Sequence, residues 1–250
     1  MIVRHHENQS FLIHQPAHAR HSAFLLACLR PEFVGDFRSQ HDALIAARHH
    51  DDGWLRAEAA PALNSQGLPL NFTELPKSAT LENWRVGTID ALYRFGPFTA
   101  TVIALHAEAQ IAEEQSAVPA PPGTWRALTE ALQARAVAER GEQAIEQLHV
   151  ASTAVSFADA LSLKALVGWD STGLHETLLM DGAPGRRDAF TIRHDGMWTL
   201  RVSPWPFAFT EITAPVDAVA IPEGSEHHAS RMLSTTGEWV YRIRVRILPE

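Results

Sequence analysis

Two imidazoles and two carboxylates follow one another in His49, His50, Asp51 and Asp52, at the end of a segment that is typical of an apolar helix. A histidine beside an aspartate can present one neutral nitrogen and one anionic oxygen to the same divalent cation, a donor set that suits Fe, Mn, Zn or Co. The alternative is a polar, solvated helix C-terminus, where histidine interacts favourably with the helix dipole but two aspartates do not. The acids therefore favour a metal site built on His50 and Asp51, which needs partners from distant parts of the chain.

Two further histidines are candidate partners. His18 falls in the first turn of a helix predicted over residues 15–29, and His106 ends the apolar segment 98–106. A lone histidine on an apolar face is more often a hydrogen-bonded core residue than a ligand, so each of them needs support from a neighbour.

Asp159 is the acid for which a purely structural role is hardest to argue. It lies in an apolar helix predicted over residues 152–168, where an ionised carboxylate is costly unless it is paired or bound to a metal. Holding it against Asp51 in a low-dielectric interior would raise the pKa of at least one of the two carboxyl groups, whereas a divalent cation would remove the repulsion. We therefore expect Asp51→Asn to leave the metal-free protein as stable as the wild type, or more so.

The composition limits what such a site can belong to. With 250 residues, 46% of them hydrophobic, the chain can bury a substantial core. A net charge of -8 argues against a nucleic-acid partner, and a small anionic ligand would need a local cation. No apolar run reaches the ~20 residues that span a bilayer, and no signal peptide is visible, so we expect a cytoplasmic protein without a membrane partner. Cys28 is the only cysteine, which leaves no disulfide or thiolate site.

The hydrophobic period changes near residue 188. Asp195 and Gly196 are typical of a hairpin turn, and residues 241–247 alternate apolar side chains with arginines, which predicts a half-buried strand with a basic, solvated outer face. The sequence therefore predicts an α+β fold. Its mainly helical body, with a short N-terminal strand, covers residues 1–187, and an antiparallel β segment over 188–250 packs on that body as part of one compact domain.

The order of a helical histidine, a His-Asp doublet and a late aspartate resembles the H…HD…D pattern of the HD-domain superfamily of metal-dependent phosphohydrolases. The pattern maps onto His18, His50, Asp51 and Asp159. This resemblance implies an HD-domain-like helical core with a bound divalent metal. HD enzymes commonly continue the doublet with a small residue and a lysine, where this chain has Asp52, Gly53 and Trp54, so phosphate contact must come from elsewhere. The arginines nearest in sequence are Arg20, Arg48 and Arg56.

Nearly the whole chain also resembles DUF3891, an uncharacterised family of conserved bacterial proteins. The matching segments are Met1–Arg4, Gln15–Ala19, His50–Trp54, Leu105–His106, Asp159–Leu163 and Pro204–Phe207. This second resemblance names no activity, so it does not by itself imply a function.

Two classes of function remain open. In the first, the ligands hold a divalent metal that activates a bound water against a phosphate ester, with Asp52 as the candidate proton acceptor. A variant of this class adds His106 and a second metal, as in di-iron oxygenases of the HD fold. In the second class, the same cavity binds a small ligand or a metal without turnover. The residues indicate neither the identity of the metal nor the oligomeric state.

Overall fold

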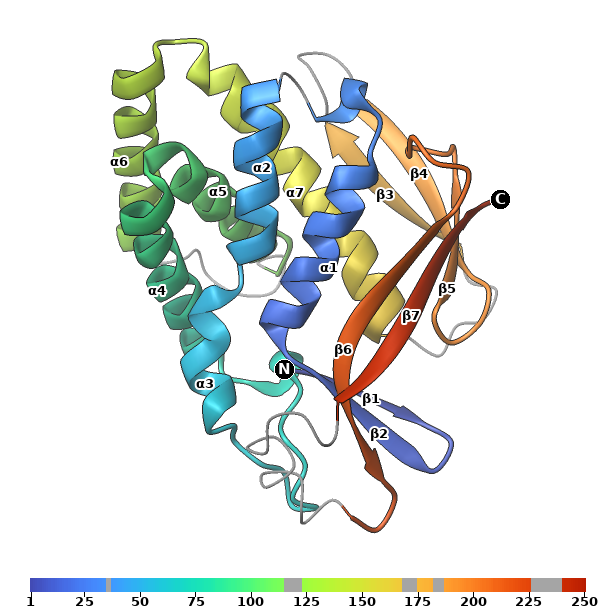
Figure 1. The fold of residues 1–250 in the computed structure, drawn as a ribbon. Coiled ribbons are helices and arrows are strands. Elements are labelled where there is room, and N and C mark those ends of the chain that lie inside the picture. The colour runs from blue at the N-terminus through green and yellow to red at the C-terminus, as the bar shows by residue number, and fades with distance from the viewer. Residues whose placement is uncertain (35–36, 115–122, 168–174, 182–186, 226–239) are drawn as a thin grey trace.

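The computed structural model describes residues 1–34, 37–114, 123–167, 175–181, 187–225 and 240–250. Within these ranges the fold is α+β, as predicted, with helices packed on one curled sheet (Figure 1). The helices are α1 (Gln15–Cys28), α2 (Phe37–His49), α3 (Leu55–Ala59), α4 (Lys77–Phe95), α5 (Pro97–Glu114), α6 (Gly123–Arg140) and α7 (Ala144–Val167). The strands are β1 (Ile2–His6), β2 (Gln9–Ile13), β3 (His175–Asp181), β4 (Arg187–His194), β5 (Thr199–Ser203), β6 (Ile212–Pro222) and β7 (Val240–Pro249).

Helix α7 lies at the centre of the helical layer, in contact with α1, α2 and α5. It begins earlier than the predicted helix over 152–168, and Gly168 lies outside the described residues. Helix α7 is long and apolar enough to cross a membrane, but 56% of its most apolar 18-residue stretch is buried inside the protein. Its position between the other helices and the sheet accounts for that composition without a membrane, while the cytoplasmic location stays a prediction.

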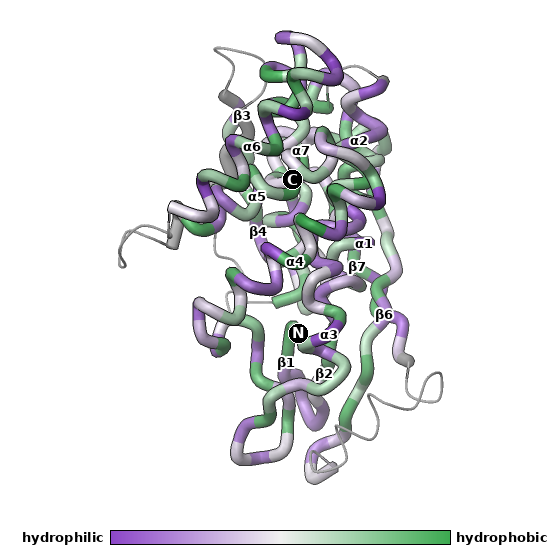
Figure 2. The backbone as a smooth tube through the Cα atoms, turned by 90° about the vertical axis from the view of Figure 1, so that its left-hand side faces the viewer, coloured by the Kyte–Doolittle hydropathy of each residue, from purple (hydrophilic) through white to green (hydrophobic). Residues whose placement is uncertain are grey.

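Helices and sheet share one hydrophobic core. Phe157 of α7 packs against Phe190 of β4, with ring centroids 4.8 Å apart, and both side chains are buried. Helices α4, α5 and α6 lie on the side away from the sheet, where hydrophilic and hydrophobic stretches alternate along them (Figure 2). This alternation is expected of helices that bury one face and expose the other.

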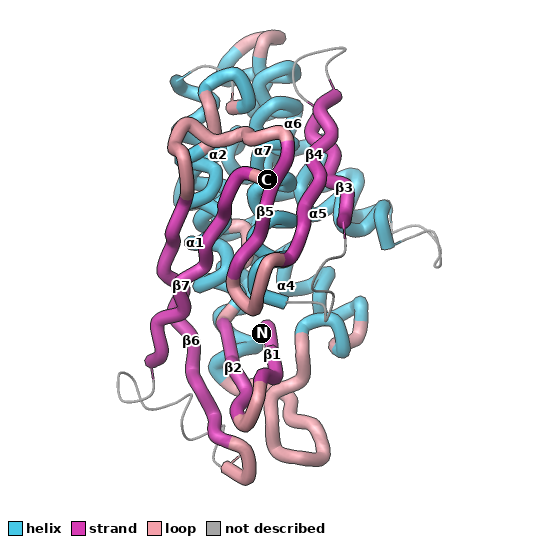
Figure 3. Tube along the Cα trace, turned by 90° about the vertical axis from the view of Figure 1, so that its right-hand side faces the viewer, coloured by secondary structure: helices cyan, strands magenta, loops and turns pink. Residues whose placement is uncertain are grey.

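The strand pairing differs from the predicted antiparallel appendage in two respects. The strand order is β1-β2-β6-β7-β5-β4-β3, so the N-terminal hairpin joins the sheet through the pairing of β2 with β6, and the β5–β7 pair is parallel (Figure 3). Both features are pairings between segments distant in sequence, which local periodicity does not encode. The predicted boundary at residues 187–188 falls at the start of β4, so β3 lies in the range that was expected to be helical apart from its N-terminal strand. Whether the two ranges fold separately stays a prediction.

The local β predictions are confirmed except at Tyr241, which is 51% exposed although its place in the alternation predicted an inward side chain. Asp195 and Gly196 form the turn between β4 and β5, and Gly196 has a φ of 127°, a conformation that favours glycine. On β7 the side chains of Ile243, Val245 and Ile247 are buried, while the arginines between them face outward. The sheet thus presents its apolar face to α1 and α7.

Candidate metal centre

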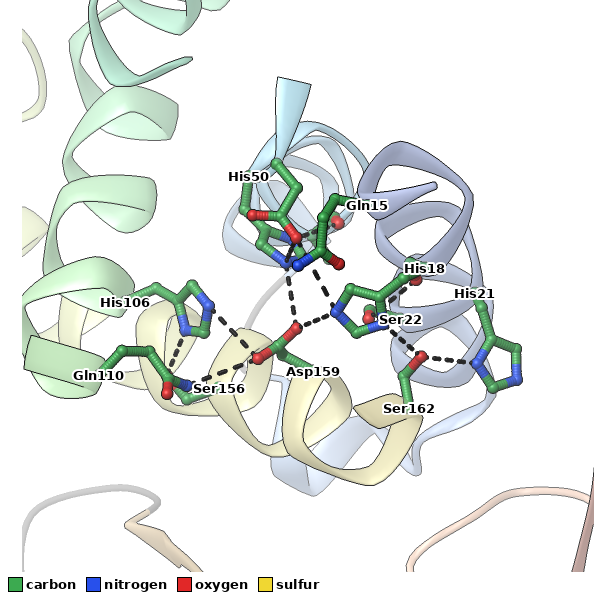
Figure 4. A network of polar contacts seen from close by, with 12 residues as sticks. Gln15, His18, His21, Ser22, His50, His106, Gln110, Ser156, Asp159 and Ser162 are labelled. Atoms are coloured by element: carbon green, nitrogen blue, oxygen red, sulfur yellow. Dashed lines mark hydrogen bonds and ion pairs between the residues drawn. The ribbon is translucent and has the colours of Figure 1, made fainter. Parts of the chain in front are cut away.

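Asp159, on α7, is the centre of a buried group of histidines. Its Oδ1 lies 2.6 Å from His18 Nε2 and 3.0 Å from His50 Nε2 (Figure 4). Its Oδ2 lies 3.5 Å from His106 Nε2 and 3.5 Å from the side-chain nitrogen of Gln110. The side chains come from α1 (His18), from the residue directly after α2 (His50), from α5 (His106 and Gln110) and from α7 (Asp159), so packing of the helical layer assembles this point.

Asp51 completes the group. Its Oδ2 lies 3.3 Å from His50 Nε2 and 4.0 Å from His18 Nε2. The structure thereby brings together all five residues predicted as ligands, and each is buried. We call them the His/Asp cluster: His18, His50, Asp51, His106 and Asp159.

The spacing of the donor atoms fits a metal ion. Ligand atoms 2.0–2.2 Å from a common ion lie roughly 3–3.5 Å from one another in tetrahedral or octahedral geometry. The contacts within the cluster run from 2.6 to 4.0 Å. The cluster contains two sets of three residues, and within each set all donor atoms lie within 4.8 Å of one another. One set is His18, His50 and Asp51, and the other is His50, His106 and Asp159. These buried groups could therefore hold a metal ion.

Each imidazole is held from outside by its second ring nitrogen. His50 Nδ1 donates to the carbonyl of Ala47 at 2.8 Å, which leaves Nε2 as the atom that faces the cluster. His18 Nδ1 contacts Ser162 Oγ at 2.8 Å, and His106 Nδ1 contacts Ser156 Oγ at 2.9 Å. Metal-binding histidines almost always use the outer nitrogen in this way, which fixes the ring orientation.

The electrostatics differ from the expected repulsion between two acids. Burial opposes the charge on His50, but the carboxylates of Asp51 and Asp159 together raise its pKa well above the ordinary value. Burial also opposes ionisation of the two acids, yet the facing histidines lower the pKa of Asp51 and hold that of Asp159 well below its usual range. The expectation that one carboxyl pKa is raised is therefore wrong, because a protonated His50 lies between the two anions.

Two further buried histidines, His106 and His21, have lowered pKa values. Burial lowers the pKa of His106 to about 4, against the opposing attraction of Asp159, and burial together with His18 lowers the pKa of His21 to about 3. The acidic neighbours of His50 therefore favour its protonated form at neutral pH, whereas burial favours the neutral form of His106 and His21.

The turn after α2 places Asp51 through close backbone packing. After His49 the chain enters a 3-10 turn (Asp52–Trp54) that packs against α4. A Cβ on Gly53 would lie 1.8 Å from the carbonyl oxygen of Asn83, and one on Gly87 would lie 3.0 Å from the Gly53 nitrogen. Two glycines therefore allow the backbones of the turn and of α4 to touch directly beneath the cluster.

Asp52 does not join the cluster, which corrects the expectation that it accepts a proton there. Its Oδ2 instead accepts hydrogen bonds from His49 Nδ1 at 2.8 Å and from Arg94 at 2.9 Å. The 3-10 turn redirects the chain between Asp51 and Asp52, so the two neighbouring acids face different surroundings.

A cavity of about 380 Å³ opens onto the cluster. The walls include the aromatic rings of Trp54, Phe72 and Trp84, and Lys77 and Thr80 from the first turn of α4 also line it. The three arginines considered as phosphate contacts are exposed and do not line this cavity: Arg20, Arg48 and Arg56.

Several polar residues around the cluster were not identified from the sequence. They are Gln15, His21, Gln110, Ser156 and Ser162. Ser162 and His21 stand three residues after Asp159 and His18 on their helices, a spacing that places side chains on one face and could have indicated them.

Comparison with known proteins gives a match to a sequence family. The family model described as "Protein of unknown function (DUF3891)" matches residues 1–223. No curated protein and no solved structure matches the chain.

Proposed function

Since the chain belongs to the DUF3891 family, whose description states no activity, we propose its function from the site itself: a metal-dependent hydrolase whose His/Asp cluster holds one divalent cation. One observation carries this proposal. Three imidazoles point Nε2 at a single buried carboxylate while each Nδ1 is bonded outward. The convergence of His18, the His50-Asp51 doublet and Asp159 also supports an HD-like helical body.

The donor atoms favour one ion over two. An imidazole nitrogen has a single lone pair and can bind one ion. The two sets of donor atoms share His50, so its Nε2 cannot serve a separate ion in each set. Five donors around one ion leave one position of an octahedron open. The described residues therefore support a mononuclear site more than the di-iron alternative.

The cavity favours catalysis over a structural ion. Structural metal sites are closed, whereas catalytic sites keep a position open to water or substrate. Here His18, His50 and Asp159 line an open cavity instead of a sealed core. A divalent cation bound there would supply a water of lowered pKa and an electrophile for a phosphoryl oxygen.

The residues of the chain prepare the site for these roles. Asp51 and Asp159 provide the negative charge that offsets a cation, and the outward hydrogen bonds fix the direction of the imidazole Nε2 atoms. His50 must release its proton before it can bind a cation, so uptake of the metal is coupled to proton release.

The cavity suits a small phosphate ester. Lys77 and Thr80 bring the first turn of α4 to its wall, and the N-terminal end of a helix favours anions. The aromatic rings of Trp54, Phe72 and Trp84 offer an apolar surface for the ester group. These residues take the place of the arginines considered from the sequence.

A matched pair of histidine variants tests the proposal. Protein purified without chelator is stripped with EDTA, reloaded with Mn, Fe, Zn or Co, and assayed for bound metal and for hydrolysis of p-nitrophenyl phosphate and its diester. His50→Ala should abolish both, whereas His49→Ala should retain both, because the His49 ring contacts Asp52 and Phe95 outside the cluster. Absence of metal uptake refutes the metal site, and uptake without turnover favours the non-catalytic alternative.

A further inference from the structure

A buried serine hydroxyl lies between two imidazoles at the edge of the cluster. Ser162 Oγ is 2.8 Å from His18 Nδ1 and 2.7 Å from His21 Nδ1 (Figure 4). All three side chains are at most 2% exposed. We call this chain of hydrogen bonds the relay: His18, Ser162 and His21.

The number of protons restricts the relay. A serine hydroxyl has one proton, so Ser162 cannot donate to both imidazoles at once. A neutral imidazole carries its proton on either Nδ1 or Nε2, so the tautomer of His18 constrains the role of Ser162 and, through it, the tautomer of His21.

Without a cation, the contact between His18 and Asp159 favours one direction of the relay. His18 Nε2 lies 2.6 Å from the ionised Asp159, so the proton of a neutral His18 ring is on Nε2, and Nδ1 accepts from Ser162. Ser162 then accepts from His21 Nδ1. This leaves His21 Nε2 without a proton, and this buried atom has no hydrogen-bond partner among the described residues.

A cation requires the opposite direction. A ligand nitrogen must be unprotonated, so the proton of His18 moves to Nδ1 and donates to Ser162. The proton of Ser162 is then no longer directed at His18, so Ser162 can donate it to His21 Nδ1, with the proton of His21 on Nε2. In this arrangement both hydrogen bonds are reversed, although His21 itself does not contact the ion.

We propose that Ser162 and His21 are positioning residues of the metal site, which set the tautomer of His18 and reverse both hydrogen bonds of the relay when a cation binds. This inference rests on the proposed metal site and adds a residue outside it that responds to the metal. No bond other than N–H and O–H is formed or broken, and the number of protons in the relay is unchanged.

Long-range ¹H–¹⁵N correlation spectra of protein with ¹⁵N-labelled histidine test the proposal, because they distinguish the two imidazole tautomers. His21 should carry its proton on Nδ1 with EDTA and on Nε2 with Zn²⁺. If the signals of His18 and His50 show zinc binding while the tautomer of His21 stays the same, the relay is refuted and the metal site stands. If no histidine responds to zinc, both proposals fail.

Two serine variants separate positioning from packing. Ser162→Ala should lower zinc affinity about 10–100-fold, the usual effect of removing an outer partner of a metal-binding histidine, and should uncouple His21 from zinc. Ser22→Ala is the matched control, because Ser22 is equally buried on α1 but bonds the backbone carbonyl of His18 and not its ring. Wild-type zinc affinity in Ser162→Ala, or an equal loss in both variants, would contradict the positioning role.

Discussion

Replacing Asp159 by Asn removes the charge at the centre of the His/Asp cluster while it preserves the size of the side chain. The carboxylate accepts from His18 at 2.6 Å and from His50 at 3.0 Å, and Asp159 is 3% exposed. In the variant the protonated His50 keeps only Asp51 as an acidic partner. Removal of one partner from a buried ion pair is strongly destabilising, because the remaining charge is left in a low-dielectric interior.

The expected loss of unfolding free energy is about 3–5 kcal/mol without metal. For a chain of this length the melting temperature changes by about 2–4 °C per kcal/mol, so a fall on the order of 10 °C is expected. Asp51→Asn should also destabilise the protein without metal, contrary to the expectation from the sequence, because Asp51 helps to hold the proton on His50.

The pH of the measurement follows from the direction of the pKa shifts. Asp159 has a lowered pKa, so its stabilisation is present above 3.8, the unfolded value, and is lost as the pH falls through the folded value. His50 has a raised pKa, so the stabilisation that it contributes is present below pH 6.5, its pKa in the unfolded chain, and is lost as the pH rises through its pKa in the folded protein. The difference between wild type and variant should therefore be largest between about pH 4 and 6.5.

Thermal unfolding at pH 6 in EDTA, followed by circular dichroism, provides the assay. Asp52→Asn is the matched control, since Asp52 also accepts from a histidine and lies next to Asp51 but is outside the cluster. The Asp52→Asn variant should lose no more than about 1 kcal/mol of unfolding free energy, as is usual for partly exposed ion pairs. A melting temperature of Asp159→Asn equal to or above that of the wild type would refute the account of a carboxylate paired with a protonated histidine.

Three further predictions follow from the packing and the charges. Gly53→Ala should lower the free energy of unfolding, measured by chemical denaturation, by at least about 1–3 kcal/mol and should lower metal content, because the added Cβ meets the Asn83 carbonyl. Gly123→Ala should change the free energy of unfolding little, because a Cβ there meets open space, and equal stabilities of the two variants would contradict the contact. Metal affinity measured by titration calorimetry should tighten from pH 5 to 8 with release of a proton, because His50 must deprotonate; affinity independent of pH would oppose this. His106→Gln should reduce the loss of unfolding free energy on acidification. A histidine that stays neutral in the folded protein but is protonated in the unfolded chain lowers the free energy of unfolding by about 3 kcal/mol as the pH falls from 6.5 to about 4. An unchanged dependence of stability on acid pH would show that His106 is not held neutral.

The ligand residues could be predicted from the sequence because their chemistry conflicts with their surroundings. Asp159 stands in an apolar helix, and His50 with Asp51 puts acids at a helix end where the dipole disfavours them. Such conflicts are visible without a structure, and the order H…HD…D linked His18 to them. His106 was predicted as a ligand only because it is a histidine at the end of an apolar helical segment.

The direction of individual side chains could not be predicted in this way. Asp52 follows Asp51 directly, but a 3-10 turn sends it to Arg94, and nothing in the local pattern indicates that turn. Ser162 and His21 become partners only because α1 packs on α7, a contact between segments far apart in sequence. The parallel β5–β7 pair was missed for the same reason.

The claim that the His/Asp cluster holds one divalent cation is tested most directly by locating the ion. Crystals grown with Mn²⁺ and measured for anomalous scattering should show one strong peak, about 2.0–2.3 Å from the Nε2 atoms of His18, His50 and His106 and from a carboxylate oxygen of Asp51 and of Asp159. Crystals of His50→Ala grown in the same way should lack this peak. Well-ordered wild-type crystals with no anomalous peak at the cluster, and with His50 still bonded to both carboxylates, would contradict the account.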